Sequence, residues 1–457
     1  MDNEGHGHKK IGLFGATCVV AGNMIGSGVF MLPASLAAVS GPGATLVAWL
    51  ITGIGSIFMA LSCARLGSRI PKTGGPYEFG KLAFGDFIGF LNAWLYWSAT
   101  WISNAAIIIA IGSYASYLIP ALNNGFNALL FNSAILWIFT FLNIKGAKEA
   151  ASFETVITVF KFLVFIFFII FAASHFNMGN VTPMMPKGKG LSTLPLAATT
   201  TLWAFTGFES SAVGAGTIKD PEKNISRSTI LGLVITILFY IAISFFAMGA
   251  IPQDVLAKSP SPMTDILAQF FGGGVVKAFN LAIVITILGT IAGWIMIAGQ
   301  MSYAVAKDGL FPAVFAKLHP KYKTPYKGLI INAILTNILL ILNSSKGMVS
   351  AYNFMILLAT LSYLPVYATT SASDILLLFK CRGQLTVGKF IKIAIIPLIG
   401  FTYACWAIYG SGAETVLYGF MLMLAGVPFY IYMKLKNKKD ISKADIDIDN
   451  IVEYSNE

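Results

Sequence analysis

The chain has 457 residues, of which 56% are hydrophobic and only 11% are charged, and its mean hydropathy is +0.75. A soluble domain carries about 25% charged residues, so this composition excludes a soluble globular protein. The net charge of +11 is spread over the loops between apolar segments. This distribution argues against a nucleic-acid-binding protein.

Twelve apolar segments are long enough to cross a bilayer, which takes about 20 residues each. They predict an all-α integral membrane protein with twelve transmembrane helices and leave no room for a sizeable soluble domain. The first segment is too long and too rich in glycine for the apolar core of a signal peptide, so we interpret it as the first span. In chain order the predicted spans are 11–38, 43–69, 87–119, 126–143, 153–175, 194–217, 228–251, 276–306, 328–345, 349–374, 390–410 and 415–435.

Lysine and arginine are unequally distributed between the loops. With the N-terminus placed inside, 25 of the 31 Lys and Arg residues fall on one face of the membrane. Cytoplasmic loops carry an excess of basic residues, so this bias predicts cytoplasmic tails at 1–10 and 436–457 on a multi-pass protein of the bacterial inner membrane. The loop lysines of the other face are Lys187, Lys189, Lys258, Lys277 and Lys346.

The first and sixth predicted spans are interrupted near their middles. The stretch "AGNMIGSGVF" places Gly26, Ser27 and Gly28 inside the first span. In the sixth, "TTTLWAFTGFESSAVGAG" contains Gly207 and the charged Glu209. The two spans hold matching positions in two consecutive sets of five, which is typical of the substrate site in an inverted-repeat transporter. The predicted units are two five-helix repeats at 11–175 and 194–374, the second inverted, and helices 11 and 12 at 390–435.

An interrupted helix offers free peptide groups, which are tolerated at membrane depth only where they line a cavity. The half-helix that begins after a break presents its positive end to a carboxylate, and the half-helix that ends at a break presents carbonyl groups to a cation. We therefore predict that the breaks bind a zwitterion, with Gly26, Ser27 and Gly28 holding the carboxylate of an amino acid. The alternative is close helix packing through small residues, for which Gly22 and Gly26 have the required spacing.

Two ionisable residues and two tryptophans fall deep inside predicted spans. Glu209 is a candidate for taking up and releasing a proton, and its alternative is a neutral packing residue. We interpret Lys161 as a proton-coupling group or a positive strut between helices, with snorkelling to an interface as the alternative. The rings of Trp203 and Trp294 could stack on a guanidinium or ammonium group.

Other residues narrow the class of function. In "LYWSATWISN", Thr100 and Asn104 lie four apart on one helical face, where Asn104 could offer a carbonyl to a donor-rich side chain. Histidines and cysteines are dispersed, without the spacing of a catalytic triad, a disulfide framework or a metal site, and no phosphate-binding loop occurs. We therefore predict no enzyme, no metal and no cofactor, with gradients supplying the energy.

Several motifs carry a resemblance to a known family. They are "NMIGSGVFMLP" in the first span, "GGPYEFG" after the second, "LWAFTGFES" in the sixth, and "GWIMIAGQ" with "AKDGLFP" in and after the eighth. Along essentially its whole length the sequence resembles the amino acid, polyamine and organocation superfamily. It is most similar to the basic amino acid and polyamine antiporter branch, which includes arginine/agmatine and putrescine/ornithine exchangers.

The resemblance implies roles for individual residues. Met24, Ser27 and Gly28 would hold the substrate carboxylate, while carbonyl groups near Trp203 and Thr206 would receive the α-amino group. Trp203 would also stack on the substrate as an outer gate. The other implied residues are Ala99, Thr100, Asn104 and Ser362 for substrate binding, Trp294 for closure of the inward path, and Tyr77, Tyr96, Glu209 and Lys161 for gating or proton coupling.

The sequence departs from this branch at a few positions. Val366 stands where the exchanger has a gating tyrosine, and Tyr363 or Tyr367 is a candidate replacement. Ile107 stands where the exchanger has a methionine, near the part of the site that would hold the end of the substrate side chain. Lys161 resembles the fifth-span lysine of proton-coupled amino acid permeases elsewhere in the superfamily.

The predicted function is a secondary active amino acid transporter that works by alternating access. It would exchange a cationic amino acid such as arginine for its decarboxylated amine or a related amino acid. The rival within the same class is a proton-coupled symporter of neutral amino acids. A non-transporting amino acid sensor would need a signalling domain that the short tail after Lys434 does not offer, and bulky tryptophans beside the breaks disfavour a channel. The expected partners are an amino acid or polyamine substrate, protons and the lipid bilayer, with a homodimer as a further hypothesis.

Overall fold

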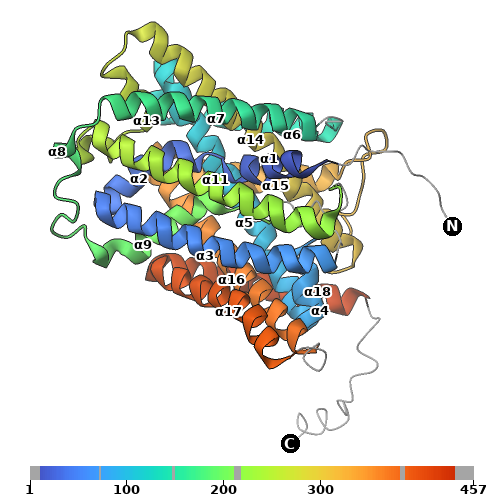
Figure 1. Cartoon of the computed structure of the whole chain (residues 1–457). Helices are drawn as coiled ribbons and strands as arrows, with labels where there is room; N and C mark the ends of the chain where they lie inside the picture. Colours follow the sequence, from blue (N-terminus) through green and yellow to red (C-terminus); the bar gives the residue numbers. More distant parts are fainter. Residues whose placement is uncertain (1–10, 71–73, 147–149, 210–217, 381–385, 438–457) are drawn as a thin grey trace, which may run out of the picture.

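The computed structural model describes residues 11–70, 74–146, 150–209, 218–380 and 386–437. These residues fold into helices joined by turns and loops (Figure 1). The α-helices are α1 (Leu13–Met24), α2 (Gly28–Val39), α3 (Pro42–Arg69), α4 (Pro76–Phe84), α5 (Asp86–Leu118), α6 (Gly125–Lys145), α7 (Ala150–Ser174), α8 (Met178–Val181), α9 (Leu194–Leu202), α11 (Pro221–Ala250), α12 (Gln253–Leu256), α13 (Pro262–Ala268), α14 (Gly273–Lys307), α15 (Tyr326–Asn343), α16 (Met348–Lys380), α17 (Val387–Gly410) and α18 (Ala413–Asn437). Short 3-10 helices are η1 (Pro120–Asn123), η2 (Leu191–Thr193), η3 (Trp203–Phe205) and η5 (Ser344–Lys346).

Most of the predicted spans are found as helices. Within the described ranges, ten helices are long and apolar enough to cross a membrane, and the bent pair α1 and α2 makes an eleventh span. The sixth predicted span, 194–217, is represented by the short helix α9 and by η3, because residues 210–217 lie outside the described residues. The predicted tails, 1–10 and nearly all of 436–457, lie outside them as well.

Helix α5 lies at the centre of the bundle and α18 at its edge. In the most apolar part of α5, 94% of the residues are buried, against 17% in α18. α5 packs against α14 and α16, whereas α6, α17 and α18 expose long apolar side chains. A helix that exposes such side chains is stable only in an apolar solvent, so these outer faces are suited to lipid.

The helices share one end that is rich in lysine and arginine. Ion pairs and hydrogen bonds there join α4 to the last turn of α14, α5 to α18, and α3 to α16. We call it the basic end, and the other the opposite end. The basic residues at the helix termini on this end are Arg69, Lys145, Lys307, Lys380 and Lys434.

Candidate functional site

The first predicted span is broken at the position of the glycines. α1 ends at Met24, α2 begins at Gly28, and the two half-helices are bent by 41°. Glycine favours close approach here: a Cβ on Gly26 would lie 3.2 Å from Thr290 Cγ2, and one on Gly28 would lie 3.1 Å from Trp203 Cδ1, so either neighbour would have to shift slightly. No side chain caps the first turn of α2, so its amide groups point into the break. The predicted interruption of the first span is confirmed.

Lys161 of α7 holds the end of α1. Its side chain is 2% exposed, and Nζ donates hydrogen bonds to Gly22 O at 3.1 Å, Ile25 O at 2.7 Å and Thr290 Oγ1 at 2.8 Å. An ammonium group has three donors, and these acceptors use all of them. The positive charge also lies at a helix C-terminus, where it is favourable. Snorkelling of Lys161 to an interface is therefore wrong, because the side chain bridges α1, α7 and α14.

The second break lies against the first. After α9 and η3 the chain becomes extended at Thr206 (ψ 134°) and turns at Gly207, whose φ of 106° favours glycine. A Cβ on Gly207 would lie 3.1 Å from the backbone of Asn23, so the two interrupted segments touch. The Tyr240 hydroxyl joins them, since it lies 2.9 Å from both Met24 O and Ala204 O.

A small cavity separates the two breaks. It offers about 10 Å³ to a water-sized molecule, which is close to the minimum for one water. An amino acid therefore needs movement of the surrounding helices before it fits. The lining residues are Asn23, Met24, Gly26, Ser27, Gly28, Ile107, Trp203, Thr206 and Trp294.

Four of the predicted substrate residues are buried but do not line this cavity. Ala99, Thr100 and Asn104 lie on α5 and Ser362 lies on α16. The hydroxyls of Thr100 and Ser362 each donate to a carbonyl of their own helix, at 2.6 Å and 2.8 Å. Asn104 Oδ1 differs, because it has no hydrogen-bond donor within the described part of the chain. Asn104, one turn before the lining residue Ile107 on α5, thus keeps an acceptor without a donor in the described structure.

Glu209 is enclosed by tyrosines on the side of the breaks that faces the basic end. Its side chain is 1% exposed. Oε1 accepts from Tyr96 Oη at 2.9 Å, and Oε2 accepts from Tyr367 Oη at 3.2 Å and from the Gly207 amide at 3.2 Å. Tyr363 stacks on Tyr367 with ring centroids 5.9 Å apart. Of the two candidate replacements for the missing tyrosine, Tyr367 is therefore the one that contacts Glu209.

A tyrosine that sequence reasoning missed lies on the opposite side of the breaks. Tyr352 of α16 is fully buried, and its hydroxyl accepts a hydrogen bond from Trp203 Nε1 at 3.1 Å. Nearby, Tyr114 Oη donates to Phe30 O at 2.7 Å and ties α5 to α2. The cavity is thus covered toward the opposite end by Trp203 and Tyr352.

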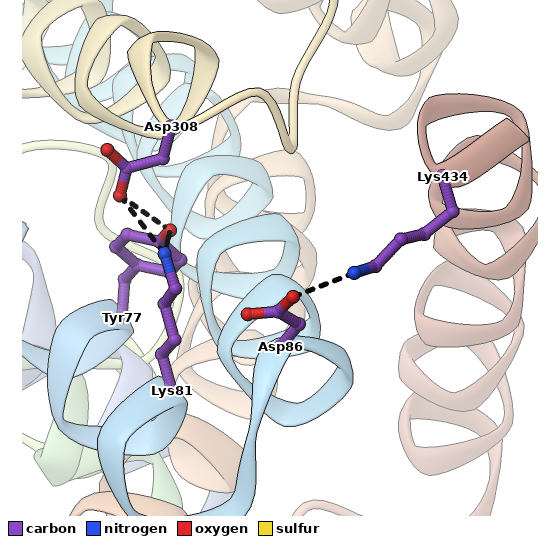
Figure 2. Close-up of polar contacts among 5 residues, drawn as sticks. All are labelled: Tyr77, Lys81, Asp86, Asp308 and Lys434. Atoms are coloured by element: carbon purple, nitrogen blue, oxygen red, sulfur yellow. Dashed lines mark hydrogen bonds and ion pairs between the residues drawn. The ribbon is translucent and has the colours of Figure 1, made fainter. Parts of the chain in front are cut away.

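Tyr77 lies far from the cavity, in a polar network at the basic end. Figure 2 shows Tyr77 and Lys81 of α4 reaching Asp308, which follows α14, while Asp86 separately faces Lys434 of α18. Tyr77 Oη donates to Asp308 Oδ2 at 2.8 Å, and Lys81 Nζ lies 3.5 Å from the same oxygen. Burial raises the pKa of Tyr77 above its ordinary value, and so does the hydrogen bond from its hydroxyl to the Asp308 carboxylate. Tyr77 therefore donates as a neutral phenol and ties α4 to α14.

We expect the Asp308→Asn variant to loosen the basic end, because it removes the charge that pairs with Lys81. The pair is about one third exposed, so the effect should be small, about 2- to 5-fold. The measurement is the labelling rate, by a water-soluble maleimide, of a cysteine at Gln300, which lines a narrow cavity between Tyr96 and the basic end. The Asp86→Asn variant breaks the pair with Lys434 instead and is the control. Equal labelling rates in the two variants would contradict a closing role for Asp308.

The geometry can now be compared with known proteins. The family model for amino acid permeases matches residues 11–432. A putative amino-acid transporter of Clostridium perfringens is 29% identical, with 96% of this chain and 95% of the relative covered. The arginine/agmatine antiporter of Chlamydia pneumoniae is 30% identical, with 94% and 91% covered. A putative arginine/ornithine antiporter of Bacillus subtilis is 31% identical, with 94% and 98% covered.

These matches cover both breaks, the Glu209 cluster and the basic end, so they apply to the whole described helical bundle. The motifs of the first, sixth and eighth spans are all inside the matched residues. An enzyme is excluded, since the family and these relatives are permeases and transporters. The chain is a multi-pass membrane protein that belongs to the amino acid permease family of the amino acid, polyamine and organocation superfamily.

Proposed function

We propose that this transporter exchanges a cationic amino acid such as arginine for its decarboxylated amine or a related amino acid. The observation that carries the proposal is the meeting of two interrupted helices around a cavity that also has two tryptophan side chains in its wall. The first amides of α2 suit a carboxylate. The carbonyls of η3 suit an α-amino group, since those of Ala204 and Phe205 each have a second lone pair beside the hydrogen bond already accepted. The names of the relatives from Chlamydia and Bacillus support a substrate with a cationic side chain.

The substrate side chain would extend from the breaks toward α5 and α14. Trp203 and Trp294 offer ring faces to a guanidinium or ammonium group. Asn104 Oδ1, which has no donor in the described structure, would accept from that group. The residues that contact the charged end of the substrate side chain are then all neutral. A cation that is bound without a buried counter-charge can also dissociate, and an exchanger needs this.

Transport would proceed by alternating opening of the two ends. We propose that the basic end faces the cytoplasm, that Trp203 forms the outer gate, and that Trp294 with the Glu209 and Tyr96 pair forms the inner gate. Glu209 would take up and release a proton during this change. The repeats 11–175 and 194–374 would move relative to each other, and the exposed faces of α17 and α18, within 390–435, would mediate a homodimer.

Proton-coupled symport of a neutral amino acid is the second candidate, and Lys161 is the observation that favours it. Its ammonium group lies at the C-terminus of α1 with three acceptors, in a place that requires positive charge. Release of a proton from Lys161 would weaken these contacts and loosen the first break. Coupling would then come from Lys161 and not from an exchanged solute.

Counterflow in proteoliposomes separates the two candidates. Vesicles loaded with unlabelled agmatine or arginine are expected to take up labelled arginine without a pH gradient, whereas empty vesicles are not. An imposed inward proton gradient should not drive uptake of labelled arginine into vesicles that contain no internal amino acid or amine. Uptake of labelled leucine into empty vesicles, driven by the proton gradient, would overturn the exchange proposal and support symport.

Replacing Trp203 with leucine is expected to weaken arginine binding. The ring face is lost, and a cation–π contact in a desolvated site contributes about 1 to 2 kcal/mol, which corresponds to about 5- to 30-fold in Kd. Equilibrium binding of labelled arginine to purified protein measures the change. Trp137→Leu, on the outer helix α6, is the matched control and should bind like the wild type. An unchanged Kd in Trp203→Leu would reject the stacking role.

A further inference from the structure

Tyr352 has a buried hydroxyl that accepts one hydrogen bond and lies beside a second buried hydroxyl. It accepts from Trp203 Nε1 at 3.1 Å, so its own proton needs a separate acceptor. The Ser27 hydroxyl lies beside it. Ser27 is 1% exposed, yet its Oγ makes no hydrogen bond of ordinary geometry within the residues that the structure describes. Two buried hydroxyls, from α16 and from the first break, therefore lie next to each other, and when one accepts from the other the remaining proton of the pair has no acceptor among the described residues.

The surroundings of these hydroxyls supply further donors. α2, which is 12 residues long, begins at Gly28, and the Ser27 side chain at its N-cap accepts no hydrogen bond from it, so the amides that precede Met31 have no capping acceptor within the described part of the chain. A buried donor without a partner costs about 1 to 3 kcal/mol. The carboxylate of Glu209 does not relieve this cost, because its oxygens accept from Tyr96, Tyr367 and the Gly207 amide. A cluster of donors of this kind is matched by an anion.

The position of Trp203 shows how an anion would enter. In this closed arrangement the edge of the Trp203 ring lies against Gly28, where a Cβ would meet Cδ1 at 3.1 Å. A carboxylate that binds the first turn of α2 has to displace this edge. Displacement would bring the carboxylate next to the Ser27 and Tyr352 hydroxyls, where its two oxygens can accept from both hydroxyls in place of the contact between them.

We propose that Tyr352 is a further substrate-binding residue, whose hydroxyl donates to the substrate carboxylate beside Ser27 and the start of α2. This inference rests on the proposed function in one respect, since it takes the substrate to be an amino acid held at the first break. It does not depend on the charge of the side chain. Tyr352 then distinguishes an amino acid from its decarboxylated amine, because the amine has no group for this donor.

The test compares ligands with and without a carboxylate on the Tyr352→Phe variant. Purified full-length protein is assayed by equilibrium binding with arginine, argininamide and agmatine, and with leucine and leucinamide as a second set. We expect the Kd of the amino acid that binds to rise about 10- to 100-fold, the range for a hydrogen bond to a charged group. The Kd of agmatine, which has no acceptor for this donor, should stay within about two-fold of the wild type, and the Kd of each amide should rise less than that of its amino acid, because the amide carbonyl is an uncharged acceptor.

A matched control separates binding from packing. Tyr114→Phe removes another fully buried tyrosine hydroxyl, which donates to a backbone carbonyl of α2 and not toward the break. It should affect all ligands equally or not at all. Equal weakening of arginine and agmatine, or of leucine and leucinamide, in Tyr352→Phe would overturn the proposal and leave Tyr352 as an anchor for Trp203. No weakening of any ligand would do the same. Selective loss for leucine alone would uphold Tyr352 while refuting the cationic substrate, so the two failures are distinguishable.

Discussion

Replacing Lys161 with methionine is expected to reduce transport by about 30-fold or more. The substitution keeps most of the side-chain volume but leaves Gly22 O without the Lys161 donor, and it leaves Ile25 O with only a long contact of 3.5 Å from Thr290 Oγ1. Each unsatisfied buried acceptor costs about 1 kcal/mol or more, and two such costs correspond to this factor. The substitution destabilises the conformation in which α1 ends at the first break. The fraction of molecules with a formed binding site should therefore decrease.

Exchange in proteoliposomes measures this effect, and size-exclusion chromatography shows whether the variant is folded. Thr290→Val removes only one of the three acceptors of Lys161 and should have a smaller effect, about 10-fold or less. Lys277→Met, at the exposed start of α14, serves as the matched control and should transport normally. Full activity of folded Lys161→Met would contradict the role of this lysine in holding α1.

The Glu209→Gln variant is expected to lose most of the pH dependence of transport. Glutamine keeps the shape of the side chain but cannot bind or release a proton, and its amide cannot accept from both tyrosines and the Gly207 amide at once. The loss of a hydrogen bond to a charged group should also lower the rate about 10-fold or more. Rates at pH 5 and pH 8 should then differ by no more than about two-fold.

The pH profile of arginine exchange is the measurement for Glu209, with equal internal and external pH. Glu414→Gln, in the exposed first turn of α18, controls for a general effect of removing a carboxylate. Tyr367→Phe removes one donor to Glu209 and should shift the profile without flattening it. A wild-type profile in Glu209→Gln would leave this residue with only a packing role.

The interruptions were predictable from the sequence because their cause is local. Gly26, Ser27 and Gly28 weaken the helix where they stand, and the threonines and Gly207 do the same in the sixth span. The deep charges were also visible, since Lys161 and Glu209 stand out in apolar segments. The second half of the sixth span remains a prediction, because residues 210–217 lie outside the described residues.

The partners across the bundle could not be predicted. Tyr240 lies 216 residues from Met24, and Tyr352 lies 149 residues from Trp203, so no local pattern connects them. A tyrosine in an apolar span is usually an interfacial residue. Nothing in the sequence therefore distinguishes Tyr240 and Tyr352 from the other tyrosines among the 17. Tyr363 and Tyr367 are four apart and share a helical face, so only the structure distinguishes the residue that contacts Glu209 from the one that stacks.

The most direct test of the central claim is a structure of the protein with arginine bound in a lipid nanodisc. We expect the carboxylate at the first turn of α2 beside Ser27, the α-amino group at the carbonyls of η3, and Trp203 moved away from Gly28. Arginine bound elsewhere would contradict this account, for example in the hollow of about 390 Å³ lined by Asn132 and Asn343, with both breaks unchanged.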